Sequence, residues 1–115
     1  MKDAARHLGI RGEQIALSWY LARDYQLVDR NWRCKDGELD LVLSKDNLYV
    51  FCEVKTRSSA GYGLPIEAIT PSKLAKWRKA AAQWLSTRTD ARPRKVRFDV
   101  AAVKPGGIEV IEDIL

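Results

Sequence analysis

The sequence is poor in the residues on which several classes of protein depend. It has one histidine, His7, and two cysteines, Cys34 and Cys52, among 115 residues. One histidine excludes a His-rich metal site, and a Ser-His-Asp triad would have to use His7, close to the chain end and a poor place for a general base. Two cysteines make neither a disulfide framework nor a zinc cluster, and we expect both to be ordinary packing residues in a reducing compartment.

Long apolar runs and low-complexity segments are also missing. No run approaches the roughly 20 residues needed to cross a bilayer. The first seven residues hold no apolar stretch behind a basic start, so we expect no secretory signal, no membrane partner and a cytoplasmic protein. A hydrophobic content of 46% with seven glycines and four prolines is typical of a globular chain. The length, without a visible repeat or linker, predicts a single domain over residues 1–115.

Basic residues gather in one stretch of the chain. From Lys73 to Arg97 there are nine Lys or Arg residues against one acid, Asp90, within a net charge of +5. This excess predicts a polyanionic partner, with Lys73, Lys76 and Lys79 as nucleic-acid contacts. A solvated helix face followed by a basic loop is the simpler interpretation of the same pattern.

Hydrophobic periodicity predicts the first half of the fold. Helical spacing begins after Gly12 and ends near Asp24, whereas residues 1–12 have little pattern and are expected to fray. Strand patterns follow at residues 27–32, 38–43 and 48–56. A polar turn joins the last two strands, which predicts a β-hairpin.

A second helix and two more strands complete the chain. Thr70 is a typical N-cap and Pro71 suits the first helical turn. The apolar stripe of this helix consists of Leu74, Trp77, Ala81, Trp84 and Leu85. Its opposite face carries Lys76, Lys79 and Gln83. Strands at 96–103 and 108–111 give the order αβββαββ, typical of an α/β fold with a mixed sheet and flanking helices.

Charged residues interrupt the two hairpin strands. Alternation puts Glu38 and Asp40 on one face of the first strand, and Glu53 and Lys55 on one face of the second. The apolar face of the first strand is formed by Leu39, Leu41 and Leu43. The four charged residues stand out because a strand interior seldom holds so many.

The register of the hairpin decides whether these charges meet. With a turn of two or four residues we expect Leu43 to pair with Leu48 and Asp40 to lie opposite Phe51. All four charged side chains then converge on one side of the sheet. A three-residue loop would separate them, because a slip of one residue reverses the faces of a strand.

Carboxylates crowded at the middle of a sheet repel one another and need a cation. Lys55 supplies one, and a divalent metal such as Mg²⁺ or Mn²⁺ suits carboxylate oxygens. Such a metal holds a scissile phosphate and acidifies a bound water, with Lys55 beside it to orient that water or stabilise charge on phosphorus. Glu13, on the core side of the first helix, either reaches this cluster or lies where the helix dipole favours an acid.

Several segments together resemble a known family. They are Gly12-Glu13, Asn31-Trp32-Arg33, Gly37-Glu38-Leu39-Asp40-Leu41-Val42, Phe51-Cys52-Glu53-Val54-Lys55-Thr56-Arg57, Gly63-x-Pro65, Lys73 and Arg97-Phe98-Asp99-Val100. From about Gly9 to Val103 the chain resembles the bacterial YraN-like family. That family is similar to the archaeal Holliday-junction resolvases of the restriction-endonuclease-like, PD-(D/E)xK superfamily, although Leu39 stands where the superfamily's name has proline.

The resemblance implies both a fold and a site. The fold is a restriction-endonuclease-like mixed sheet flanked by helices, and the site is that of a Mg²⁺-dependent nuclease. Asp40 and Glu53 match its metal ligands, Lys55 its catalytic lysine and Glu13 the helix-borne acid of resolvase-type members. Glu38 also matches a family position. The similar resolvases act as two-fold dimers, so we expect a homodimer.

Three functions fit these residues. The first is a metal-dependent endonuclease that hydrolyses phosphodiester bonds in DNA, with branched, Holliday-junction-like DNA as its substrate. The second is a catalytically silent nucleic-acid-binding or adaptor module on the same fold, and the third is an RNA-directed nuclease. Arg57 and the loop residue Tyr62 are further expected nucleic-acid contacts. Asp99, in an apolar strand, is expected to be structural and to pair with Arg97 or Arg94.

Overall fold

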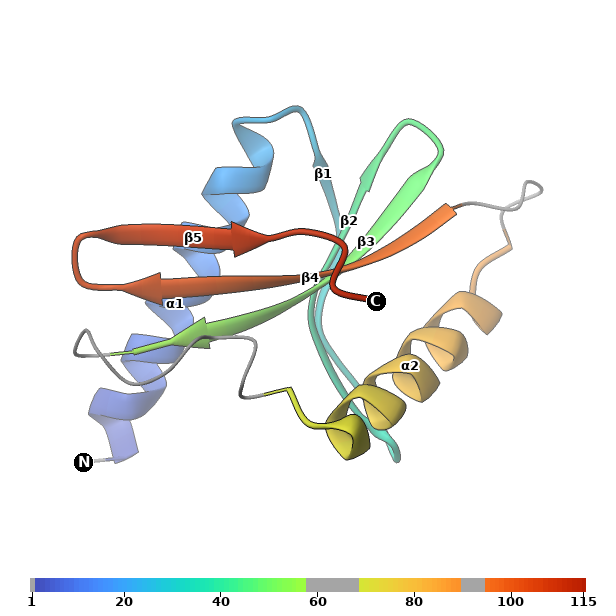
Figure 1. The fold of residues 1–115 in the computed structure, drawn as a ribbon, viewed down its shortest axis with the longest axis horizontal. Helices are drawn as coiled ribbons and strands as arrows, with labels where there is room; N and C mark the ends of the chain where they lie inside the picture. The colour runs from blue at the N-terminus through green and yellow to red at the C-terminus, as the bar shows by residue number, and fades with distance from the viewer. Residues whose placement is uncertain (1, 58–68, 90–94) are drawn as a thin grey trace.

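The chain folds into a five-stranded sheet with a helix on each side, in a computed structural model (Figure 1). Residues 2–57, 69–89 and 95–115 are described, with side chains from Ile10 onward. Their elements are α1 (Lys2–Leu21), β1 (Gln26–Cys34), β2 (Gly37–Lys45), β3 (Leu48–Thr56), α2 (Pro71–Ser86), β4 (Lys95–Lys104) and β5 (Gly107–Ile111). The predicted order αβββαββ and the mixed sheet with flanking helices are confirmed.

The sheet has the strand order β1-β2-β3-β4-β5. β3 and β4 run parallel, with α2 in the connection between them, and the other neighbouring strands run antiparallel. Thr70 caps α2 as expected, because its Oγ1 accepts a hydrogen bond of 3.1 Å from the backbone N–H of Lys73. Over the described ranges, no helix combines the length and the apolar character needed to cross a membrane.

Each helix covers its own hydrophobic core. The core under α2 contains Leu39, Val42, Tyr49, Phe51, Trp77, Ala80, Ala81, Trp84, Phe98 and Val100. The core under α1 contains Ala16, Leu17, Tyr20, Leu41, Leu43, Val50, Cys52 and Ala101. Trp84 meets Tyr49 and Phe51 edge-on, with ring centroids 5.1 and 5.7 Å apart. These aromatic rings give a small domain a large buried apolar area.

A buried carboxylate ties α1 to β4. Asp99 is fully buried and accepts hydrogen bonds from the Tyr20 hydroxyl at 2.7 Å and from Arg97 at 2.9 and 2.8 Å. The backbone N–H of Asp113 donates a further bond of 3.0 Å. Hydrogen bonding to Asp99 raises the pKa of Arg97, while burial raises the pKa of Tyr20. The prediction that Asp99 is structural and pairs with Arg97 is confirmed, whereas Arg94 lies outside the described residues.

Two expectations about the helices are wrong. α1 begins at Lys2 and not after Gly12, because residues 2–11 are mostly good helix formers despite their irregular apolar spacing. Gln83 is not on a solvated face: its Nε2 donates a 3.1 Å hydrogen bond to Asp36 Oδ2, since the turn between β1 and β2 lies against that side of α2.

The register of the hairpin also differs from the expected one. Lys45 pairs with Leu48 across a two-residue turn that contains Asp46 at a φ of 53°. Leu43 therefore pairs with Val50 and not with Leu48, because β2 extends two residues further than its pattern suggested. A shift of two residues does not by itself change the face on which a side chain lies.

Candidate functional site

The site is built around the point where β2 leaves β3. Pairing between these strands ends at Leu41 and Cys52, while β3 continues to pair with β4 as far as Thr56. At the point of separation Asp40 Oδ2 accepts a 2.8 Å hydrogen bond from the backbone N–H of Val54. The carboxylate thus takes the place that a backbone carbonyl would fill in a continuous ladder.

A break in the side-chain alternation of β2 accompanies this separation. Leu41 and Leu43 belong to the core under α1, as expected, but Leu39 belongs to the core under α2 together with Val42. The expectation of Leu39, Leu41 and Leu43 on one face is therefore wrong. From Asp40 toward its beginning at Gly37, β2 therefore leaves β3 and lies against α2.

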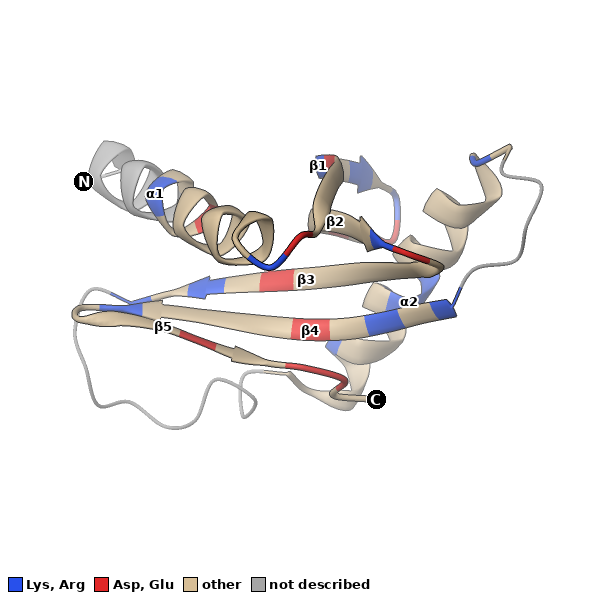
Figure 2. Cartoon of the chain, turned by 90° about the horizontal axis from the view of Figure 1, so that it is seen from above, with Lys and Arg blue, Asp and Glu red and all other residues tan. Residues whose placement is uncertain are grey.

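Glu53 and Lys55 lie on the part of β3 that β2 no longer covers. Figure 2 shows this acidic position followed by a basic one along β3. Lys55 Nζ lies 3.3 Å from Glu53 Oε1, and both side chains are about one quarter exposed, at 27% and 25%. Solvent partly screens an ion pair of this exposure, while the partial burial restricts the positions that the two side chains can take.

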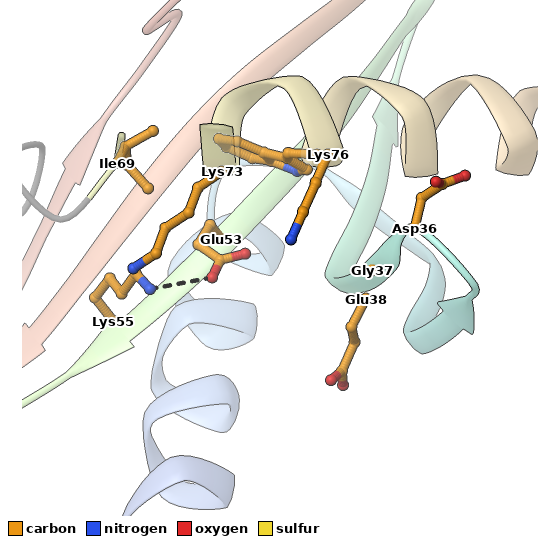
Figure 3. A pocket seen from close by; sticks show the side chains of 9 residues that line it. Asp36, Gly37, Glu38, Glu53, Lys55, Ile69, Lys73 and Lys76 are labelled. Atoms are coloured by element: carbon orange, nitrogen blue, oxygen red, sulfur yellow. Dashed lines mark ion pairs between the residues drawn. The ribbon is translucent and has the colours of Figure 1, made fainter. Parts of the chain in front are cut away.

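These two residues line a pocket of about 220 Å³ between β3, the turn of β1 and β2, and the start of α2. Lys73 and Lys76 also line it, and Figure 3 shows their side chains directed from α2 toward Glu53 and Lys55. Glu38 lines the opposite wall. The pocket therefore combines acidic and basic side chains from three elements.

Asp40 has the most perturbed carboxyl group of this region. Burial is the main cause that raises its pKa to about 7, and the neighbouring charge of Glu53 is the second. Glu13 and Glu38 act in the same direction, whereas the hydrogen bond from Val54 opposes them. The predicted acids thus lie close enough to one another to repel.

Glu13 approaches this group from α1. Because α1 begins at Lys2, Glu13 lies in the middle of the helix, and the alternative that the helix dipole explains it is wrong. Its side chain is 17% exposed, and Oε2 lies 3.9 Å from Nη2 of Arg30 on β1. Arg30 was not predicted, and it became recognisable only through the pairing of Arg30 with Leu41, next to Asp40.

The remaining predicted contacts are dispersed. Lys79 is exposed on α2 and does not line the pocket. Arg57 follows β3, where its backbone N–H donates to Val103 O at 2.8 Å, and lines a different pocket. Glu38 Oε2 lies 3.5 Å from Arg33 Nε. Tyr62 lies outside the described residues.

The donor chemistry of the site fits Mg²⁺ or Mn²⁺. Across 2–57, 69–89 and 95–115 no three His, Cys, Asp or Glu side chains already form a metal-binding group. Mg²⁺ usually takes only one or two protein carboxylates and completes its shell with waters and phosphate oxygens. Asp40 and Glu53 would supply those carboxylates, and a cation beside them would relieve the repulsion at Asp40.

Comparisons with known proteins place the chain in a family. The model of Uncharacterised protein family UPF0102 matches residues 12–103. A UPF0102 protein of Beutenbergia cavernae is 52% identical over 102 residues, which cover 89% of this chain and 83% of the relative. UPF0102 proteins of Clavibacter michiganensis subsp. michiganensis and Geobacter sulfurreducens are 47% and 46% identical over 96 residues, covering 84% of this chain and 80% and 74% of the relatives. The chain therefore belongs to the UPF0102 family, the family expected as YraN-like from its motifs.

Proposed function

We propose that this protein is a metal-dependent endonuclease on a restriction-endonuclease-like fold, which hydrolyses phosphodiester bonds in DNA. The observation that carries the proposal is the placement of Asp40, at the separation of β2 and β3, within electrostatic reach of Glu53 and Glu13. Lys55 lies 3.3 Å from Glu53, so carboxylates and a cation gather on the part of β3 that β2 no longer covers. Branched DNA is the proposed substrate, on the strength of the resemblance to resolvases.

Each residue has a proposed role. Asp40 and Glu53 would hold Mg²⁺ or Mn²⁺, and a metal there would supply Lewis-acid chemistry for the scissile phosphate and for a bound water. Glu53 also directs the Lys55 ammonium into the pocket across a distance of 3.3 Å. Lys55 stabilises the negative charge that builds on the phosphoryl oxygens. Glu13, from α1, adds negative charge that favours the metal.

Lys73 and Lys76 support the choice of a polyanionic substrate. Both line the pocket that contains Glu53 and Lys55, and both come from the exposed side of the first turns of α2. Lysines in this position bind backbone phosphates and do not read bases, so recognition rests on shape and charge. The proposed homodimer would present two such sites, one to each strand of a branched substrate.

A cleavage panel tests the proposal. The parent protein is incubated with duplex, branched and single-stranded DNA and with structured RNA, in Mg²⁺ or Mn²⁺. We expect cleavage of branched DNA, and a loss of about 10²–10³-fold in rate for Lys55→Met, the usual cost of removing one electrostatic stabiliser. Asp40→Asn should abolish cleavage.

Asp36→Asn is the matched control. Asp36 lines the same pocket, but its carboxylate accepts from Gln83, a role that an Asn oxygen can keep. It should cleave like the parent. Equal rates for Asp40→Asn and the parent would refute the proposal. If the parent cleaves RNA and none of the DNA substrates, RNA replaces DNA as the proposed substrate.

The Glu53–Lys55 ion pair also suits a silent binding module, because it satisfies both charges without a metal. Such a module would bind DNA with the same affinity in EDTA and in Mn²⁺, and would turn over no substrate. Binding curves under the two conditions, measured beside the cleavage panel, separate the two functions.

A further inference from the structure

A second pocket lies between α1 and the ends of β3 and β4, on the α1 side of the sheet, whereas the Glu53–Lys55 pocket lies on the α2 side. Its volume is about 240 Å³, several times the roughly 30 Å³ that one water occupies in the liquid. Arg11 of α1, Arg57 after β3 and Lys104 of β4 line it. Figure 2 shows basic residues on α1 and at the neighbouring ends of β3 and β4. Three cations from three separate elements thus meet at one pocket.

This pocket has one sign of charge. Of the residues that the structure describes, no Asp or Glu lines it. Within the same ranges, none of Arg11, Arg57 and Lys104 forms an ion pair with an acid. Three cations held together without an acid repel one another, which an anion would relieve.

The framework of the pocket is fixed by close backbone contacts. Gly12 of α1 packs so tightly on β3 that an added Cβ would lie 1.9 Å from Thr56 Oγ1. The next residue, Arg57, is tied to β4 by the 2.8 Å bond from its N–H to Val103 O. Arg11 directly precedes Gly12, and Lys104 directly follows Val103. Each of the three cations is therefore on, or next to, a residue whose backbone is held by these contacts.

The pocket is continuous in sequence with the proposed active site on two elements. On α1, Arg11 and Gly12 stand directly before Glu13. On β3, Arg57 stands two residues after Lys55, about 7 Å along an extended chain.

We infer that this second pocket binds a backbone phosphate of the same nucleic acid whose scissile phosphate enters the Glu53–Lys55 pocket. Arg11, Arg57 and Lys104 are its ligands and positioning residues for the strand. This inference rests on the proposed function, because it takes the bound polymer to be the substrate. It adds a second point of contact, which fixes the direction of the strand across the open edge of β3.

Salt dependence of DNA binding tests the inference without turnover. Labelled duplex and branched DNA are titrated with the full chain in EDTA between 50 and 200 mM salt, and affinity is measured by fluorescence anisotropy. Each lost phosphate contact lowers the slope of log K against log salt by about 0.9. Because Arg11, Arg57 and Lys104 share one phosphate, Arg11→Gln/Lys104→Gln should lower the slope by about 0.9.

Arg23→Gln/Lys95→Gln is the matched control, because it removes the same charge. Lys95 begins β4, at the opposite end of the strand from Lys104, and Arg23 follows α1 at the opposite end from Arg11. Thermal unfolding confirms that both variants are folded, and Arg57→Gln alone provides a second pocket variant. The control should change the slope by less than half as much as the pocket variant.

Each outcome decides the question. Equal slopes for the pocket variants and the control overturn the inference, and cleavage by the parent would leave the proposed function standing. A slope lowered in the pocket variants, with a parent that cleaves nothing, supports the phosphate site and rejects the nuclease. A parent that binds no nucleic acid at 50 mM salt overturns both.

Discussion

Gly12→Ala isolates the contact that brings α1 to the candidate site. The new Cβ would lie 1.9 Å from Thr56 Oγ1, 3.0 Å from its Cβ and 3.1 Å from its Cγ2. Oγ1 is the atom that overlaps, so the Thr56 side chain has to rotate away, α1 has to move away from β3, or both. Any movement of α1 moves Glu13 with it.

Two opposing effects set the size of the change. Ala is favoured over Gly in a helix interior by about 1 kcal/mol, whereas overpacking costs about 1–3 kcal/mol. We expect Gly12→Ala to lower the free energy of unfolding by about 1–2 kcal/mol, the overlap being severe. In a Thr56→Ala background, which removes Oγ1 and Cγ2, the same change should be neutral or stabilising by up to about 1 kcal/mol.

Urea unfolding of the parent, both single variants and the double variant gives the coupling between the two positions. The expected coupling is about 1–3 kcal/mol, the size of the relieved overlap. A Gly12→Ala protein that is more stable than the parent by the full helix propensity would refute the close contact, and with it the placement of Glu13.

Three further predictions concern stability. Because burial and Glu53 raise the pKa of Asp40 from 3.8 to about 7, ionising this group opposes folding, and metal-free stability should fall as pH rises from about 4 to about 7. Asp40→Asn removes this loss, so its melting temperature should exceed that of the parent at pH 8 by more than at pH 5. Between pH 5 and about pH 7 the stability advantage of the variant can grow by at most about 3 kcal/mol, at about 1.4 kcal/mol per pH unit; an unchanged difference would contradict the burial of a charged Asp40. Asp99→Ala removes the fully buried carboxylate that accepts from Arg97 and Tyr20, while the more exposed Glu112 stays 3.4 Å from Arg97. The change should cost about 3–5 kcal/mol in urea unfolding; a cost below about 1 kcal/mol would contradict the network. Thr70→Ala removes the N-cap of α2 and should cost about 1 kcal/mol, as thermal unfolding would show, with no cost if the cap is not formed in solution.

Local signals were enough to predict much of the fold. β3 begins and ends at the predicted residues 48–56, because a segment rich in Val, Tyr and Phe favours a strand over its whole length. Thr70 and Pro71 marked the start of α2 for reasons contained in one turn of helix. Such signals need no knowledge of what the element packs against.

The geometry of the site depended on tertiary contacts and was only partly predictable. The bend at Asp40 interrupts an alternation that is perfect in the sequence, because β2 leaves β3 while it stays paired with β1. The position of Arg30 beside Glu13 likewise follows from a register that neither segment encodes alone. The sequence nevertheless singles out Asp40, Glu53, Lys55 and Glu13 as candidates, since a charge inside an apolar pattern is visible without its partners.

Isothermal titration with Mn²⁺ is the most direct test of the central claim, that Asp40 and Glu53 form a cation site at the separation of β2 and β3. We expect one binding event per chain for the parent and for Asp36→Asn, because the Asp36 carboxylate accepts from Gln83 in the same pocket. We expect no binding by Asp40→Asn, with its fold confirmed by circular dichroism. Equal binding by Asp40→Asn and the parent, or no binding by the parent, would overturn the cation site.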